Sequence, residues 1–168
     1  MALPVQPYRE TKAGYCGPAA LKMVLAYYGV SQPEEKLAQE LGTKPTPGTP
    51  PEALVKVAQQ YGFEAQAKEH STFGDIAQYL KQKVPVIVDW FSSGVTEEET
   101  SDGHYSVVID LDDKYIYLQD PELGRARKFA REDFLRVWFD FPGNSIGSPQ
   151  DIMLRQLIAI YPKKTGSS

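Results

Sequence analysis

Thiol and imidazole side chains are scarce in this sequence. Its 168 residues include one cysteine, Cys16, and two histidines, His70 and His104. A single cysteine excludes an intramolecular disulfide and a zinc site built from several thiolates. Any chemistry that pairs a thiol with an imidazole must therefore use Cys16 and one of these two histidines.

Basic residues are too few for a surface that binds nucleic acid. Lys and Arg number 18 against 22 Asp and Glu, which gives a net charge of −4, whereas nucleic-acid binders usually present a basic face. No basic cluster is longer than the pair Lys163 and Lys164, so binding to an anionic membrane surface is not expected. The apolar run at residues 84–88 is far too short to span a bilayer. We expect no nucleic-acid partner and no membrane insertion.

Signals for cofactor binding and for export are also missing. No Gly-rich phosphate loop occurs, so nucleotide chemistry has no support and no cofactor is expected. Residues 1–4 lack the charged start and apolar stretch of a signal peptide. The sequence as written predicts a cytoplasmic protein, or a secreted one if a signal peptide has been removed.

The hydrophobic periodicity changes halfway along the chain. The first half predicts helices at residues 17–28, 33–41, 50–61 and 72–83, with a strand at 63–69. The second half predicts strands at 85–90, 104–111, 114–119, 125–129 and 154–161, a short helix at 131–137, and loops at 92–103 and 141–149. Helices followed by an antiparallel sheet indicate an α+β fold. We expect one domain at residues 1–162 and a tail at 163–168.

Cys16 immediately precedes the first predicted helix. A thiol there faces the positive helix end and its unpaired N–H groups, which favour the nucleophilic thiolate. A lone cysteine is more often an inert buried side chain. The context of Tyr15 and Gly17 favours the nucleophile, because Gly17 leaves the backbone open to a substrate.

A nucleophilic thiol needs a base, and the base needs a group that orients it. His104 begins a predicted strand after a polar loop, whereas His70 lies at a strand-to-helix junction, where an exposed position is expected. A hairpin that folds at residues 112–113 places Asp120, at the end of the second strand, beside His104 at the start of the first. Asp110 and Asp89 are weaker candidates for the orienting carboxylate.

Three segments together resemble the bacteriocin-processing (double-glycine leader) peptidases of the papain-like superfamily. Residues 15–21 with 27–29 resemble the family's cysteine motif, residues 103–108 its histidine motif, and Asp120–Pro121, followed by Gly124, Phe134 and Trp138, its aspartate motif. The resemblance implies a papain-like fold, with an N-terminal helical half packed on a C-terminal antiparallel sheet. It also implies Cys16 as nucleophile, His104 as base and Asp120 as orienter.

The sequence departs from this pattern six residues before the cysteine. The family resembles papain in placing there a glutamine whose amide helps to form the oxyanion hole, and here the residue is Glu10. Losing one such donor typically costs about two to three powers of ten in rate. Three interpretations remain open: Glu10 donates in its protonated form, Gln6 reaches the site instead, or the hole is defective.

Candidate substrate contacts surround these residues. Gly17 and Gly103 flank the nucleophile and the base, and Tyr15, Trp90 and Trp138 are candidates to line an aromatic cleft, although core positions are expected for at least two of these three. The loop at 92–103 carries Glu97, Glu98, Glu99 and Asp102. Such a charge run is usually a solvated loop, and its functional interpretation is an acidic rim that favours basic peptide residues.

Two hypotheses from different classes follow. The first is a free-standing cysteine peptidase acting on a peptide or protein substrate through an acyl-enzyme, and acyl transfer to another acceptor would use the same residues. The second is a non-catalytic peptide-binding domain on the same scaffold. A mononuclear metal site from Cys16, His104 and Asp120 is a third, minor reading, and we predict no metal.

Overall fold

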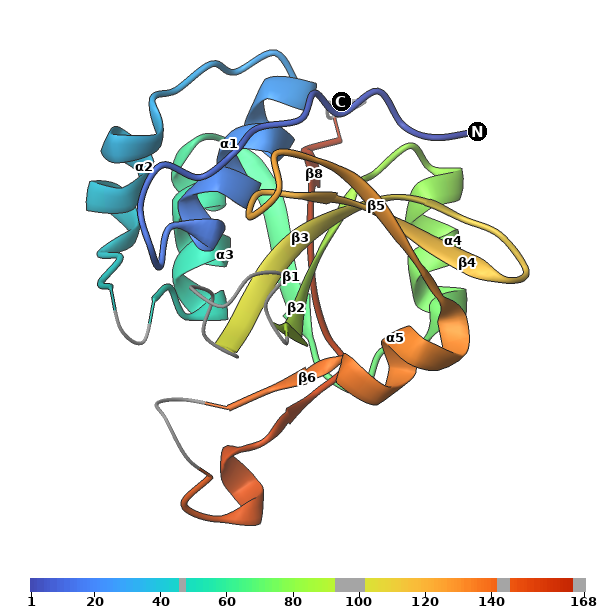
Figure 1. Ribbon diagram of the computed structural model, residues 1–168. Coiled ribbons are helices and arrows are strands. Elements are labelled where there is room, and N and C mark those ends of the chain that lie inside the picture. Colours follow the sequence, from blue (N-terminus) through green and yellow to red (C-terminus); the bar gives the residue numbers. More distant parts are fainter. Residues whose placement is uncertain (46–47, 93–101, 142–145, 165–168) are drawn as a thin grey trace.

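Six antiparallel strands form the central sheet of the computed structural model (Figure 1). The structure describes residues 1–45, 48–92, 102–141 and 146–164. The strands are β1 (Phe63–Lys68), β2 (Val86–Ser92), β3 (Asp102–Leu111), β4 (Tyr115–Asp120), β5 (Arg125–Ala130) and β8 (Gln156–Pro162), in the order β1-β8-β2-β3-β4-β5. Two short strands, β6 (Phe139–Asp140) and β7 (Met153–Leu154), pair separately.

Five α-helices of the described chain cover the two faces of this sheet. The helices α1 (Cys16–Tyr27), α2 (Glu34–Leu41) and α3 (Pro51–Gln60) lie on one side in Figure 1, and α4 (Phe73–Lys81) and α5 (Arg131–Val137) lie on the other. A 3-10 helix at Pro149–Asp151 follows β6. The fold therefore has three layers, with the sheet in the middle.

Alternating side chains of the strands divide the core between these layers. Ile87, Val107 and Ile158 pack with α1, α2 and α3 in one hydrophobic cluster. Val88 and Leu157, which alternate with them along β2 and β8, pack with α4 and α5 in the other. Because successive strand residues point to opposite faces, the apolar runs of β2 and β8 supply both clusters.

The sequence predicted the order and type of most elements correctly. The four predicted N-terminal helices correspond to α1–α4, and Thr72 begins the last of them through a capping box with Asp75. The strand predicted at 154–161 is interrupted instead. Arg155 adopts a positive φ of 48°, its N–H donates to Trp138 O at 2.9 Å, and its Nε–H donates to Ser71 O at 2.8 Å. These contacts separate β7 from β8.

Some predictions fall on the parts of the chain that the structure leaves undescribed. The acidic loop with Glu97, Glu98 and Glu99 lies outside the described residues, whereas Asp102 and Gly103 already belong to β3. The domain at 1–162 and the tail at 163–168 stay predictions. Within the described ranges, every helix is too short or too polar to cross a membrane.

Candidate active site

Cys16 is the first residue of α1, where the helix meets the sheet. Its side chain is half-buried and carries a free thiol. The preceding residue, Tyr15, provides no side-chain hydrogen bond to cap the helix, so the first N–H groups of α1 remain near the sulfur. Gly17 packs so closely on Thr49 that a Cβ would lie 2.6 Å from Thr49 Oγ1. The absence of a side chain at Gly17 thus brings the cysteine against the loop before α3.

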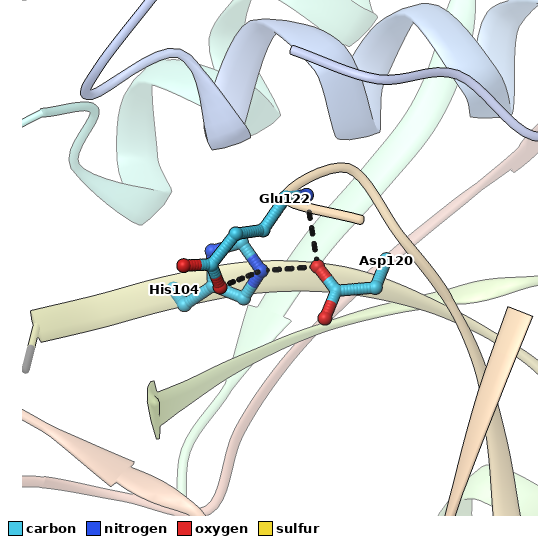
Figure 2. Close-up of side chains that lie close together, drawn as sticks. All are labelled: His104, Asp120 and Glu122. Carbon is cyan, nitrogen blue, oxygen red and sulfur yellow. Dashed lines mark hydrogen bonds and ion pairs between the residues drawn. The ribbon is translucent and has the colours of Figure 1, made fainter. Parts of the chain in front are cut away.

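His104 lies in β3, buried between the thiol and a carboxylate. Its Nε2 is 2.5 Å from Asp120 Oδ1 at the end of β4 (Figure 2), and Cys16 is close enough to the imidazole to raise its pKa. Since Nε2 is occupied by Asp120, Nδ1 is the ring nitrogen left for the thiol. The structure therefore places Asp120 against His104, the contact that the hairpin geometry predicted.

Asp120 is itself held by two further donors. Its Oδ2 accepts a hydrogen bond from Arg127 Nη1 at 2.9 Å, and its Oδ1 accepts one from the backbone N–H of Glu122 at 3.0 Å (Figure 2). Burial alone would raise the pKa of Asp120, but these hydrogen bonds and the one to His104 lower it. Asp120 is accordingly an ionised acceptor with a fixed orientation.

The charge of His104 follows from the same contacts. Burial disfavours the imidazolium, but hydrogen bonds to Asp120 and Cys16 outweigh burial and raise the pKa of His104 well above its usual value. A protonated His104 therefore lies next to the thiol as a proton donor. This arrangement suits an acid–base role for His104.

Trp90 supports the imidazole instead of lining a cleft. It is 2% exposed and packs in the core with Phe134. Its ring lies edge-on to His104 with 5.4 Å between the centroids, and its Nε1–H donates to Ser106 Oγ at 3.0 Å. The prediction that Trp90 contacts substrate does not fit this burial. Trp138 is also core, at 1% exposed.

The other predicted substrate contacts lie in different surroundings. Tyr15 is half-buried, and its hydroxyl donates to Glu35 at 3.2 Å, on the first turn of α2. Gly103 leaves space that the carboxylate of Asp140 occupies. The side chain of His70 is 66% exposed, as its position between two elements predicted.

Glu10, and not Gln6, is the residue that the fold brings close to His104 and Asp120. Gln6 is exposed, whereas the backbone N–H of Glu10 donates to Pro121 O at 2.8 Å, next to Asp120. Burial raises the pKa of Glu10 to about 7, an effect that His104 opposes and that Glu122 and Asp120 reinforce. Near neutral pH a large fraction of Glu10 is therefore a carboxylic acid, which can donate a hydrogen bond.

Glu122 is a neighbour of the base that sequence reasoning missed. Its Oε2 lies 3.7 Å from His104 Nε2 (Figure 2), and His104, Asp120 and Glu122 form a cluster with the composition of a metal site. Two ligands of one tetrahedral zinc would lie roughly 3.4 Å apart, whereas His104 and Asp120 are at hydrogen-bond distance, 2.5 Å. Their contact is that of an acid–base pair. In the sequence, only the Asp-Pro turn before Glu122 could have indicated that this residue lies near His104.

The sequence is similar to a known protein family and to several known proteins. A family model described as the Peptidase_C39 like family matches residues 2–146. An uncharacterized protein of Methanothermobacter marburgensis is 32% identical over 136 residues, which cover 81% of this chain and 82% of that protein. The transport/processing ATP-binding protein ComA of Streptococcus pneumoniae is 35% identical over 125 residues, covering 73% of this chain but 16% of ComA.

Solved structures confirm the fold. The peptidase domain of Streptococcus ComA, described as a bi-functional ABC transporter, aligns with a TM-score of 0.71 at 21% identity, covering 95% of this chain and 99% of that domain. A double glycine motif protease from the AMS/PCAT transporter, crystallised with the leader peptide, aligns with a TM-score of 0.69 at 24% identity, covering 96% and 94%. The predicted α+β fold, with helices first and the antiparallel sheet second, is that of these peptidase domains.

Proposed function

The chain belongs to the Peptidase_C39 like family, and from this membership we propose that it is a cysteine peptidase that hydrolyses peptide bonds. The observation that carries the proposal is the hydrogen bond between His104 and Asp120, with Cys16 close enough to His104 to raise the pKa of the imidazole. Thiol proteases need a nucleophile, a base and an orienting group in this order. The leader peptide bound to the AMS/PCAT protease supports a peptide as the substrate class.

The chemistry proceeds in two halves. The thiolate of Cys16 attacks the carbonyl carbon of the scissile bond, and protonated His104 gives its proton to the leaving amine as the C–N bond breaks. His104, now neutral, removes a proton from water, and the resulting hydroxide displaces the thiolate from the acyl-enzyme. Asp120 keeps Nε2 of His104 hydrogen bonded throughout, so Nδ1 faces the reacting atoms.

Glu10 supplies a donor to the oxyanion in this proposal. Its pKa of about 7 leaves a protonated carboxyl available at and below neutral pH. A neutral carboxylic acid kept in a buried site can donate a hydrogen bond to a developing oxyanion, as an amide would. The first N–H groups of α1 are the other donors near the sulfur.

The test combines turnover with the reactivity of the thiol. Cys16→Ala is expected to abolish hydrolysis of a peptide library and to keep the fold, because no second thiol exists to replace it. Iodoacetamide is expected to alkylate Cys16 faster in the wild type than in His104→Ala at the same pH, because the imidazole no longer activates the thiol in the variant.

Two results would contradict the proposal. Hydrolysis by purified Cys16→Ala protein would assign the activity to other residues. Absence of any turnover, together with alkylation of Cys16 at the rate and pH dependence of a free thiol, would favour a non-catalytic peptide-binding domain on the same scaffold.

A further inference from the structure

A cavity of about 370 Å³ lies beside the catalytic residues. Its walls come from the start of α3, from the strands β2, β3 and β6, and from the segment before β7. The lining residues are Thr49, Pro50, Pro51, Glu52, Asp89, Tyr105, Asp140, Phe141, Gln150, Asp151 and Met153. This volume is within the usual range for a ligand pocket.

Three contacts connect the cavity to the reacting groups. Tyr105 follows His104 in β3, and its hydroxyl donates to Thr49 O at 2.8 Å. Thr49 in turn packs against Gly17, next to the nucleophile. The charge of Asp89 interacts with both Cys16 and His104. The cavity is therefore adjacent to the groups at which a peptide carbonyl would react.

Asp89 is the unusual residue of the lining. It is 1% exposed, and no donor of the described chain bonds either of its carboxylate oxygens. Its neighbour is another carboxyl group, that of Asp140, with which a protonated Asp89 shares a hydrogen bond. Leaving a buried charge without a cation or donors is costly. Burial and the charge of Asp140 raise the pKa of Asp89 accordingly. A cation in the cavity would oppose this rise, because it would stabilise the ionised carboxylate of Asp89.

Among the lining residues that the structure describes, none is basic and four are acidic. Asp151 is already engaged, since it accepts hydrogen bonds from the N–H groups of Gly147 and Ser148 at 3.0 and 2.9 Å. Glu52 is exposed on the first turn of α3, so acidic groups stand both at the entrance and, with Asp89 and Asp140, inside.

A second hollow extends the cavity along the surface. Its volume is about 400 Å³, and it shares Pro51, Glu52 and Met153 with the first. It continues over Val55 to Glu69 on the side of β1. A groove of this length suits an extended chain better than an isolated small cation.

We propose that the cavity is a specificity pocket that binds a lysine or arginine side chain of the peptide substrate, with its cationic group between Asp89 and Asp140. The inference rests on the proposed peptidase function and names its substrate class.

The experiment compares pairs of peptides that differ by one charge. Fluorogenic peptides carry either lysine or norleucine, in turn, at the three positions on each side of the scissile bond. At one position, lysine is expected to raise kcat/KM about tenfold to a hundredfold, the range of a charge-assisted hydrogen bond. Asp89→Asn is expected to reduce the ratio of kcat/KM for the lysine peptide to kcat/KM for the norleucine peptide to within about twofold of unity. Asp113→Asn removes an equal charge from the exposed turn after β3 and is expected to keep the ratio.

A second measurement separates this inference from the peptidase proposal. Alkylthiolation of Cys16 by aminoethyl and by methyl methanethiosulfonate needs no turnover. In the wild type and in Asp113→Asn, the cationic aminoethyl reagent is expected to react faster than the methyl reagent. The difference between the two rates is expected to be smaller in Asp89→Asn. If Asp89→Asn fails to fold, Asp140→Asn provides the same test.

The outcomes are distinct. Cleavage of lysine and norleucine peptides at equal rates at every position would overturn the pocket and leave the peptidase intact. Absence of cleavage, with an Asp89-dependent preference for the cationic reagent, would overturn the peptidase but keep a cation-binding pocket. A lysine preference that Asp89→Asn and Asp140→Asn both retain would assign the preference to other acids and overturn the pocket.

Discussion

Besides Glu122, three side chains lie against the imidazole of His104, and each affects it differently. Asp120 occupies Nε2 at 2.5 Å, Cys16 is close enough to raise the pKa of the imidazole, and the ring of Trp90 packs against it. Burial removes the water that would compete for these hydrogen bonds. The base therefore holds one orientation before substrate arrives.

Replacing His104 should separate its role from that of the other histidine. His104→Ala is expected to remove hydrolysis and to slow alkylation of Cys16 at neutral pH, because the thiolate loses its cationic partner. His70→Ala is expected to change neither rate, since the side chain of His70 is 66% exposed. The measurements are kcat/KM and the iodoacetamide rate for both variants, and equal effects would mean that the base is misassigned.

Glu10 makes activity depend on pH in a predictable direction. Its protonated form is the donor, so kcat/KM is expected to fall as pH rises through about 7. Glu10→Gln provides an amide that does not titrate, so the variant should lack this decline and exceed the wild type above pH 8, by up to about a hundredfold. Gln6→Ala is the matched control and should follow the wild-type profile. A wild-type profile flat from pH 6 to 9 would exclude Glu10 as the donor.

At the scale of elements, the β3–β4 hairpin shows why one part of the site was predictable. The turn at residues 112–113 fixes which ends of the strands meet, and the observed register pairs Val107 with Gln119. Asp120 therefore follows within reach of His104, even though a β-bulge shifts the register between Val108 and Asp110. The short separation of His104 and Asp120 along the chain was enough to predict their contact, because a hairpin is a local structure.

Other parts depended on contacts between distant elements and had weaker signals. Asp89 was considered as a partner of His104, but its neighbour is Asp140 in β6, and nothing in the sequence near either residue predicts that contact.

The burial of Trp90 had a signal in the sequence that was not used. Trp90 continues the alternation of Val86 and Val88, both fully buried on the face of α4 and α5, so its burial follows from a period of two.

For the whole molecule, a buried titratable group couples folding to pH. The pKa of Glu10 is about 7 in the folded chain, against 4.5 when unperturbed. A raised folded-state pKa gives stability that is complete below pH 4.5 and is lost as pH rises through about 7. The loss is on the order of 3 kcal/mol at most.

Urea unfolding at pH 5 and pH 8 measures this coupling. Between these two pH values, wild-type protein is expected to lose about 2 to 3 kcal/mol more unfolding free energy than Glu10→Gln. The difference between the two proteins isolates Glu10 from His104, whose raised pKa contributes a loss in the same direction. Parallel pH profiles for the two proteins would show that Glu10 is not a buried acid in the folded chain.

The position of β8 in the sheet has a consequence for how the protein is made. β8 lies between β1 and β2 and pairs with both, although residues 93–155 separate it from β2 along the chain. At a synthesis rate of about 5–20 residues per second, the ribosome needs roughly 3 to 13 seconds to go from β2 to β8. During that interval one edge of the apolar strand at Val86–Ser92 has no partner from its own sheet. Protection of this edge on the nascent chain is therefore a requirement for the yield of folded protein, separate from the stability of the finished fold.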